Sequence, residues 1–190
     1  MNPRMPPPED DELDFTRPGA MAPAPTPQQK EVARKEAVAG SPQLNQAGFY
    51  VSIARHAEAR IPPRKGDKYK ILVVEDDADL AQLLIDIFMI AGFEVRWASN
   101  RDEINSEMKR GDDIDLLLLD IVLPDANGMQ LLRRLRGHPR FEKLPVIMVT
   151  GKATVADVQL GLAAGADGYV SKPFQMSGLV KAVNQVLGNG

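Results

Sequence analysis

From Lys70 onward the sequence alternates short β-rich runs with helix-length amphipathic segments, and no other feature restricts the fold as much. The expected strands are Ile71 to Val74, Glu94 to Ala98, Leu116 to Leu119, Val146 to Val149 and Gly168 to Ser171. The expected helices are Leu80 to Ala91, Arg101 to Lys109, Gly128 to Arg136, Val155 to Ala163 and Ser177 to Leu187. Strands that are separated by helices must pair in parallel, because each return crosses over through a helix.

Two of the expected strands are apolar at every position, LLLL at 116–119 and VIMV at 146–149. A strand of this kind is buried on both faces, so helices must cover both sides of the sheet. We therefore expect residues 69–190 to form a doubly wound α/β domain with a five-stranded parallel sheet. Its length of about 120 residues is enough for one hydrophobic core.

The first 68 residues have a different composition. Eleven of the fifteen prolines lie within residues 1–63, and residues 1–40 combine a proline run, an acidic block and an Ala/Pro segment. Such a composition buries too little apolar surface to offset the entropy of ordering, so we predict a disordered tail over 1–40. Within residues 41–68 we expect a helix over about 42–60, followed by a basic linker. Ser41-Pro42 is a good helix start, Pro62-Pro63 is a good stop, and apolar residues recur between them at spacings of three and four.

Composition argues against several classes of function. The chain has no cysteine, so it has no disulfide framework, thiolate metal site or cysteine nucleophile. Residues 1–68 carry ten basic and nine acidic residues, and residues 69–190 carry thirteen and seventeen, so neither part is a general nucleic-acid binder by charge. We see no secretory signal and no apolar stretch long enough for a membrane span, and we expect a cytoplasmic protein without membrane contact.

Polar side chains follow four of the five expected strands. They are Glu75, Asp76 and Asp77 after the first strand, Asp120 after the third, Thr150 after the fourth, and Ser171 and Lys172 at the end of the fifth. In open parallel sheets, ligands bind at this carboxyl edge. Carboxylates brought together from two strands repel each other unless a cation lies between them, and oxygen ligands without His or Cys favour Mg²⁺ over zinc. Lys172 and Thr150 suit a phosphoryl group, and Asp120 is a candidate nucleophile.

Four strings carry a resemblance to a known family: ILVVEDD (71–77), DIVLPDANG (120–128), VIMVTG (146–151) and GADGYVSKPF (165–174). In order and spacing, residues 69–190 resemble a receiver domain of bacterial two-component response regulators. The resemblance implies a flavodoxin-like fold with strand order 2-1-3-4-5. One position departs from the pattern, because Gly151 stands where the family more often has alanine.

The resemblance also implies a role for each residue at the strand ends. Asp120 is then the phospho-acceptor, and Thr150 and Lys172 contact the phosphoryl oxygens. The implied Mg²⁺ site is formed by the acidic pair Glu75 and Asp76, by Asp120, and by the main-chain carbonyl of Val122. Asp77 is interpreted instead as a charge at a helix N-terminus.

Two loop residues and one aromatic complete the match. Pro124 and Gly128 fit the turn after the phosphorylation site. Tyr169 lies where the family usually has an aromatic that responds to phosphorylation, which makes Thr150 and Tyr169 the expected switch. The implied output is binding of a downstream protein through the surface formed by the fourth helix, fifth strand and fifth helix.

The implied reaction is transfer of a phosphoryl group from a sensor histidine kinase, or from a histidine phosphotransfer protein, to Asp120. The chain is then a phosphoprotein of two-component signal transduction and not an enzyme, apart from its own phosphorylation and dephosphorylation. The sequence ends three residues after the last expected helix, and residues 1–68 show no helix-turn-helix pattern. We therefore expect a stand-alone receiver that does not bind nucleic acid and is a monomer or weak dimer.

Two alternatives stay open. The chain could be the receiver part of a DNA-binding transcriptional regulator. It could also be a metal-dependent phosphatase of the haloacid-dehalogenase type, although that chemistry needs an aspartate two residues after the nucleophile, where Val122 stands. The segment Arg55 to Pro62 is superficially similar to the histidine box of sensor kinases. Its spacing differs by one residue, so we interpret His56 as a surface histidine.

Overall fold

The structure is a computed structural model that describes residues 51–53, 61–110, 113–151 and 154–189, together with Pro27, Gln28, Glu31 and Lys35. A six-stranded sheet with the order β1-β6-β5-β4-β2-β3 forms its centre. The strands are β1 (Val51–Ile53), β2 (Lys70–Val74), β3 (Glu94–Ala98), β4 (Leu116–Leu119), β5 (Val146–Thr150) and β6 (Gly168–Ser171). The helices are α2 (Ala78–Ile90), α3 (Arg101–Arg110), α4 (Gly128–Gly137), α5 (Val155–Ala163) and α6 (Met176–Leu187).

Strands β2 to β6 are the five expected strands, and they pair in parallel. Counted from β2, their order in the sheet is 2-1-3-4-5, so the predicted fold is confirmed. The order places β2 and β4 side by side. The polar residues that follow these two strands therefore meet at one edge.

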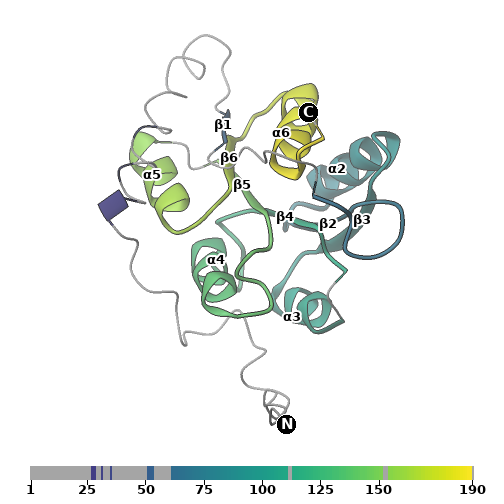
Figure 1. The fold of residues 1–190 in the computed structure, drawn as a ribbon, viewed down its shortest axis with the longest axis horizontal. Helices are drawn as coiled ribbons and strands as arrows, with labels where there is room; N and C mark the ends of the chain where they lie inside the picture. Colours follow the sequence, from purple (N-terminus) through teal and green to yellow (C-terminus); the bar gives the residue numbers. More distant parts are fainter. Residues whose placement is uncertain are drawn as a thin grey trace.

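Helices cover both faces of the sheet, with α2 and α6 on one side and α3, α4 and α5 on the other (Figure 1). Side chains along each strand alternate between two buried clusters. In β2, Leu72 and Val74 face the cluster beneath α3, α4 and α5, whereas Ile71 and Val73 face the cluster beneath α2 and α6. This alternation explains why the central strands are apolar at almost every position.

Capping side chains define where the helices next to the carboxyl edge begin. Asp77 is the N-cap of α2, and its carboxylate accepts hydrogen bonds from the amides of Asp79 and Leu80. Asn127 caps α4 in the same way. Because Asp77 satisfies these amides, α2 begins two residues before the expected start, and Asp77 has the helix-terminal role that its position suggested.

The helix expected over about 42–60 is wrong at Val51–Ile53, which form strand β1. This strand pairs antiparallel with the outer edge of β6. Two β-branched residues alternate here with a serine, a pattern that suits a strand when an open sheet edge is available to pair with. The other residues of that expected helix, His56 among them, lie outside the described residues, whereas the basic linker expected after it is described.

Most of the tail expected over 1–40 also lies outside the described residues. The four residues that are described there, Pro27, Gln28, Glu31 and Lys35, are helical, where the sequence predicted no order. Glu31 and Lys35 are one helical turn apart and form an ion pair of 3.8 Å. Ion pairs at this spacing stabilise a helix locally.

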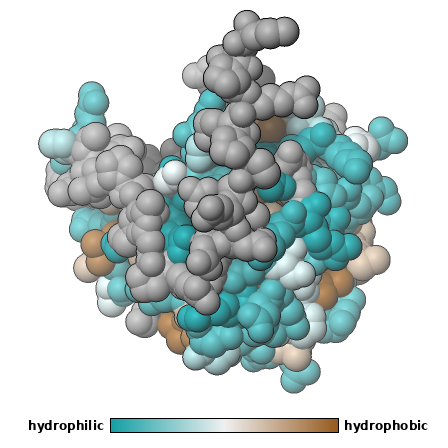
Figure 2. Space-filling view, turned by 90° about the horizontal axis from the view of Figure 1, so that it is seen from below, coloured by the Kyte–Doolittle hydropathy of each residue, from teal (hydrophilic) through white to brown (hydrophobic). Residues whose placement is uncertain are grey.

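Figure 2 shows one face of the molecule, on which hydrophilic residues predominate and hydrophobic residues form small separate patches. The large exposed apolar side chains among the described residues are spread over several elements, from Leu83 in α2 to Leu160 in α5. Within the described ranges, no helix combines the length and the apolar character that crossing a bilayer requires.

We predict that Asp115→Ala lowers the free energy of unfolding by about 1–3 kcal/mol, because it leaves two backbone amides without their acceptor. Asp115 is only 3% exposed, and its carboxylate accepts from the Arg64 amide at 2.6 Å and from the Lys70 amide at 2.8 Å. Urea denaturation measures the change. Asp115→Asn keeps one acceptor oxygen and should lose less; equal losses for the two variants would contradict this role.

Candidate functional site

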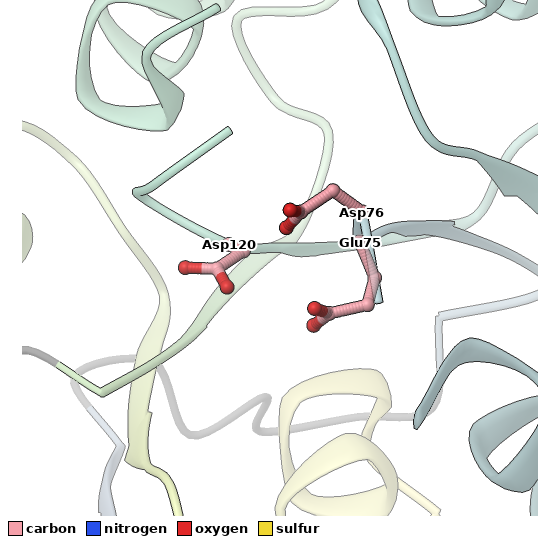
Figure 3. Close-up of side chains that lie close together, drawn as sticks. All are labelled: Glu75, Asp76 and Asp120. Carbon is pink, nitrogen blue, oxygen red and sulfur yellow. The ribbon is translucent and has the colours of Figure 1, made fainter. Parts of the chain in front are cut away.

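Three carboxylates meet at the carboxyl edge of the sheet. Glu75 and Asp76 directly follow β2, and Asp120 directly follows β4, whose neighbouring position is fixed by the Asp120 amide donating to the Val74 carbonyl at 3.0 Å. One oxygen from each carboxylate lies within 4.8 Å of the others. The side chains of Glu75 and Asp76 extend toward the side on which Asp120 lies (Figure 3). Glu75 and Asp120 are buried, whereas Asp76 is exposed.

The ammonium of Lys172 neutralises part of this negative charge. Its Nζ donates to Glu75 Oε2 and to Asp120 Oδ2, both at 2.6 Å. Lys172 follows β6, and its backbone amide is held by the Thr150 carbonyl at the end of β5. The site therefore joins the ends of four strands, with the cation supplied from the side opposite Glu75 and Asp76. The Lys172–Pro173 peptide bond in this loop is cis.

Burial and charge oppose each other at two of these groups. Burial raises the pKa of Glu75 and outweighs the lowering effect of Lys172. For Lys172, burial lowers the pKa, but hydrogen bonds to Asp120 and Glu75 outweigh it, so the pKa lies above its ordinary value. Lys172 therefore stays protonated at neutral pH and remains a fixed positive charge beside Asp120.

Backbone amides donate to two of the carboxylates, and one indole donates to the main chain of Glu75. The Val122 amide donates to Asp120 Oδ1 at 3.1 Å, and the Asp77 amide donates to Glu75 Oε1 at 3.4 Å. The indole N–H of Trp97 in β3 donates to the main-chain carbonyl of Glu75 at 2.8 Å. This contact could not be predicted from the sequence, because it depends on the pairing of β3 with β2. No local pattern around Trp97 indicates it.

Gly128, the first residue of α4, packs against the backbone of Asp120. A Cβ built on Gly128 would lie 2.0 Å from the Asp120 carbonyl oxygen, so only glycine fits. The Gly128 amide also donates to the Ile121 carbonyl at 3.0 Å. The sequence predicts a turn here. The structure shows in addition that the main chain at the start of α4 contacts the main chain of Asp120, which leaves no room for a side chain at position 128.

The remaining expected residues lie at the end of β5, in β6 and in the loop after β4. Thr150 ends β5, is fully buried, and lies beside Ser171 in the sheet register. The buried ring of Tyr169 packs near Gly161 of α5. Pro124 lies in the loop between β4 and α4. A switch formed by Thr150 and Tyr169, and a metal ligand at the Val122 carbonyl, stay predictions.

The loop after Asp120 is attached to the helix next to it. Both carboxylate oxygens of Asp125 accept from the Arg101 amide at 3.1 Å, at the start of α3. The Arg101 guanidinium donates in turn to the Asp125 main-chain carbonyl at 2.7 Å. Sequence reasoning did not single out this pair, since the two residues come from separate segments.

A family model of the response regulator receiver domain matches residues 71–184. The chain belongs to the response regulator receiver family. The match spans the receiver from β2 into α6 and includes Glu75, Asp76, Asp120, Thr150 and Lys172.

The curated relatives are longer than the region that matches this chain. It is 38% identical over 118 residues to the transcriptional regulatory protein BaeR of Escherichia coli, with 62% of this chain and 48% of that protein covered. It is 42% identical over 119 residues to the phosphate regulon transcriptional regulatory protein PhoB of Rhizobium meliloti, with coverages of 62% and 52%. The chain thus spans about half the length of these relatives.

Solved structures of similar fold are covered almost completely. A putative response regulator from Chloroflexus aurantiacus matches with a TM-score of 0.60 at 33% identity, over 64% of this chain and 99% of that one. The chemotaxis response regulator CheY4 of Vibrio cholerae matches with a TM-score of 0.59 at 27% identity, over 63% and 99%. The receiver alone therefore accounts for the structural similarity, and β1 precedes the family match.

We predict that Gly128→Ala lowers the free energy of unfolding by about 1–3 kcal/mol, because the added methyl overlaps the Asp120 backbone. Gly151→Ala is the matched control, since a Cβ there meets nothing within 4 Å. Urea denaturation of both variants compares them. Stability close to wild type in Gly128→Ala would mean that α4 can move away from β4 at little cost.

Proposed function

We propose that this chain accepts a phosphoryl group on Asp120 from a phosphohistidine of a sensor histidine kinase or histidine phosphotransfer protein. The observation that carries the proposal is the position of Asp120, which ends β4 in hydrogen-bonding contact with Lys172 and close to Glu75 and Asp76. Membership in the receiver family supports the same reaction. The chain is then an acceptor that signals through its modified state, and not an enzyme acting on a separate substrate.

The reaction needs positioning and charge neutralisation more than acid–base chemistry, because the donor bond is labile. A carboxylate oxygen of Asp120 attacks the phosphorus in line with the phosphorus–nitrogen bond. That bond breaks, the imidazole keeps its electron pair, and the new phosphorus–oxygen bond makes an acyl phosphate. The Val122 amide orients the Asp120 carboxylate. Lys172 presents its ammonium to the phosphoryl oxygens that arrive beside Asp120.

The residues at this edge fit a divalent cation. Three carboxylates within 4.8 Å of one another form an oxygen donor set without His or Cys, which suits Mg²⁺. Asp76 is the exposed member and is not bonded to Lys172, so it is available to an entering ion. Asp76, Asp120 and the Val122 carbonyl would hold Mg²⁺, with Glu75 beside them. When bound, the ion neutralises negative charge on the carboxylates and on the incoming phosphoryl group.

The output proposed here is contact with a downstream protein through α5, β6 and α6. A second candidate is favoured by the names of the relatives, which describe transcriptional regulatory proteins twice as long as the matched region. In that case the receiver would control a DNA-binding partner segment. Fluorescence anisotropy with duplex DNA, before and after phosphorylation of the full chain, separates the two: salt-sensitive binding would favour the second candidate.

We predict that incubation with acetyl phosphate and Mg²⁺ adds one phosphoryl group to the protein. Intact-protein mass spectrometry measures the gain. The adduct should be stable in acid and labile in alkali, as an acyl phosphate is. Asp120→Asn lacks the attacking carboxylate and should gain nothing; undiminished labelling of that variant would move the acceptor to another residue.

We predict that Asp76→Ala weakens Mg²⁺ binding by about tenfold or more, since even supporting groups of metal sites contribute that much. Isothermal titration calorimetry measures the affinity, and chelation of the metal should abolish labelling by acetyl phosphate. Asp79→Ala is the control, because it removes a nearby carboxylate that is not part of the cluster. Equal affinities in the wild type and in Asp76→Ala would refute the metal assignment.

A further inference from the structure

The outer edge of β6 is covered by a segment from far earlier in the chain. β6 is the last of the five parallel strands, and without β1 its edge would present unpaired backbone groups. β1 pairs there in the register Val51 with Val170, Ser52 with Tyr169 and Ile53 with Gly168. The strand lies between α5 and α6 (Figure 1). It therefore occupies the surface that the proposed function assigns to a downstream partner.

Side-chain packing joins β1 to the same surface. Ile53 is 7% exposed and belongs to the buried cluster beneath α2 and α6. In that cluster it accompanies Val170 of β6 and apolar residues of α6, which are Leu179, Ala182, Val183, Val186 and Leu187. The side chain of Ile53 thus fills a position between β6 and α6.

A second attachment lies at the C-terminal end of α6. The Ile61 amide donates to the Leu187 carbonyl at 3.0 Å. The Tyr69 hydroxyl donates to the Ile61 carbonyl and also lies 3.2 Å from Asn189 Oδ1. The segment before β2 is therefore held to α6 independently of β1. If β1 detaches, this second attachment keeps it close to β6.

The size of β1 makes its docking easy to reverse. The strand has three residues, of which Ile53 belongs to the buried core. Strands this short gain little from packing compared with the entropy lost on ordering them. Elements of this kind are the ones that a modest change elsewhere can release.

The strand that β1 pairs with ends at the phosphorylation site. Tyr169 and Val170 pair with β1, and Lys172 two residues later donates to Asp120 and Glu75. A phosphoryl group on Asp120 brings new anionic oxygens to the ammonium of Lys172. If Lys172 changes partners in response, the end of β6 moves with it, and the contacts of β1 with β6 would then differ between the two states of Asp120. Such a difference is what coupling between two sites requires.

We propose that β1 is an internal ligand of the β6 edge, that phosphorylation of Asp120 releases it, and that the freed edge takes up an extended segment of a partner protein by strand addition. The partner segment would resemble β1 itself, with β-branched apolar residues at alternate positions, because that pattern fits the β6 edge and the position of Ile53. The inference rests on the proposed function and adds its regulation.

Hydrogen exchange on the full chain with Mg²⁺, read by mass spectrometry, tests the release. Amides of Val51–Ile53 should exchange about tenfold faster after treatment with acetyl phosphate, and Asp120→Asn should show no change. The intact mass of the same samples reports phosphorylation. A mass gain with unchanged exchange in β1 overturns the inference alone, whereas no mass gain overturns the proposed function together with it.

Two isoleucine variants separate docking from a general effect of charge. Ile53→Asp should release β1 without acetyl phosphate, because it places a carboxylate in the cluster. Ile90→Asp makes the same change at a side chain that is 88% exposed on α2 and should leave β1 protected. Protection in β2 and β4 shows that both variants stay folded. Retained protection of β1 in Ile53→Asp would refute the docking mode.

A synthetic peptide with the sequence of residues 48–56 is the probe for the freed edge. By fluorescence anisotropy it should bind the phosphorylated chain and the Ile53→Asp variant at least about tenfold more tightly than the unmodified wild type. The same peptide with Asp at the position of Ile53 should not bind. Equal affinity for the phosphorylated and unmodified chains would refute strand addition as the mode of output.

Discussion

The negative charge gathered at one edge of the sheet is the constraint on which the rest of the structure depends. Parallel pairing of β2 with β4 brings Glu75, Asp76 and Asp120 together, and two of these carboxylates are buried. Such a cluster persists because Lys172 supplies a short ion pair to each buried carboxylate. Removing one partner of a buried pair costs more than the pair itself contributes, so all four strand ends must keep their register for the site to remain intact. Three carboxylates face one ammonium, so the cluster keeps a formal excess of negative charge that a bound cation would offset.

The five parallel strands and the helices on both faces could be predicted from the residue pattern, and the order of the strands from the resemblance to the receiver family. The central strands are apolar at almost every residue, and the residues that follow them are polar, so periodicity and strand ends point to the same architecture. The members of the site could be named for the same reason: Glu75, Asp76, Asp120 and Lys172 each stand at the end of a strand, and the topology brings these ends together. Element boundaries shifted by one or two residues where a cap such as Asp77 sets the start.

The features that were missed depend on partners far away in the sequence. The apolar residues around Val51–Ile53 recur at helical spacing, but these three residues form a strand. The edge of β6 offers them backbone hydrogen bonds, which cannot be predicted from the local sequence. Trp97 and Gly128 contact main-chain atoms of Glu75 and Asp120, and only the folded backbone shows how closely they approach. These contacts place the site within a wider structure: β3 and α4 fix the carboxylates, while β6 connects them to the surface that β1 covers. Asp120 is therefore connected to the outer edge of the sheet through Lys172 and β6.

The central claim is that this cluster directs a phosphoryl group to Asp120 and to no other carboxylate. Borohydride reduces an aspartyl phosphate to homoserine, so reduction of the phosphorylated protein followed by peptide mass mapping locates the modified residue. The account predicts homoserine at position 120, in the peptide that joins β4 to α4. Homoserine at position 76, 2-amino-5-hydroxypentanoic acid (the reduction product of a glutamyl phosphate) at position 75, or a phosphorylated protein that yields neither product would contradict it.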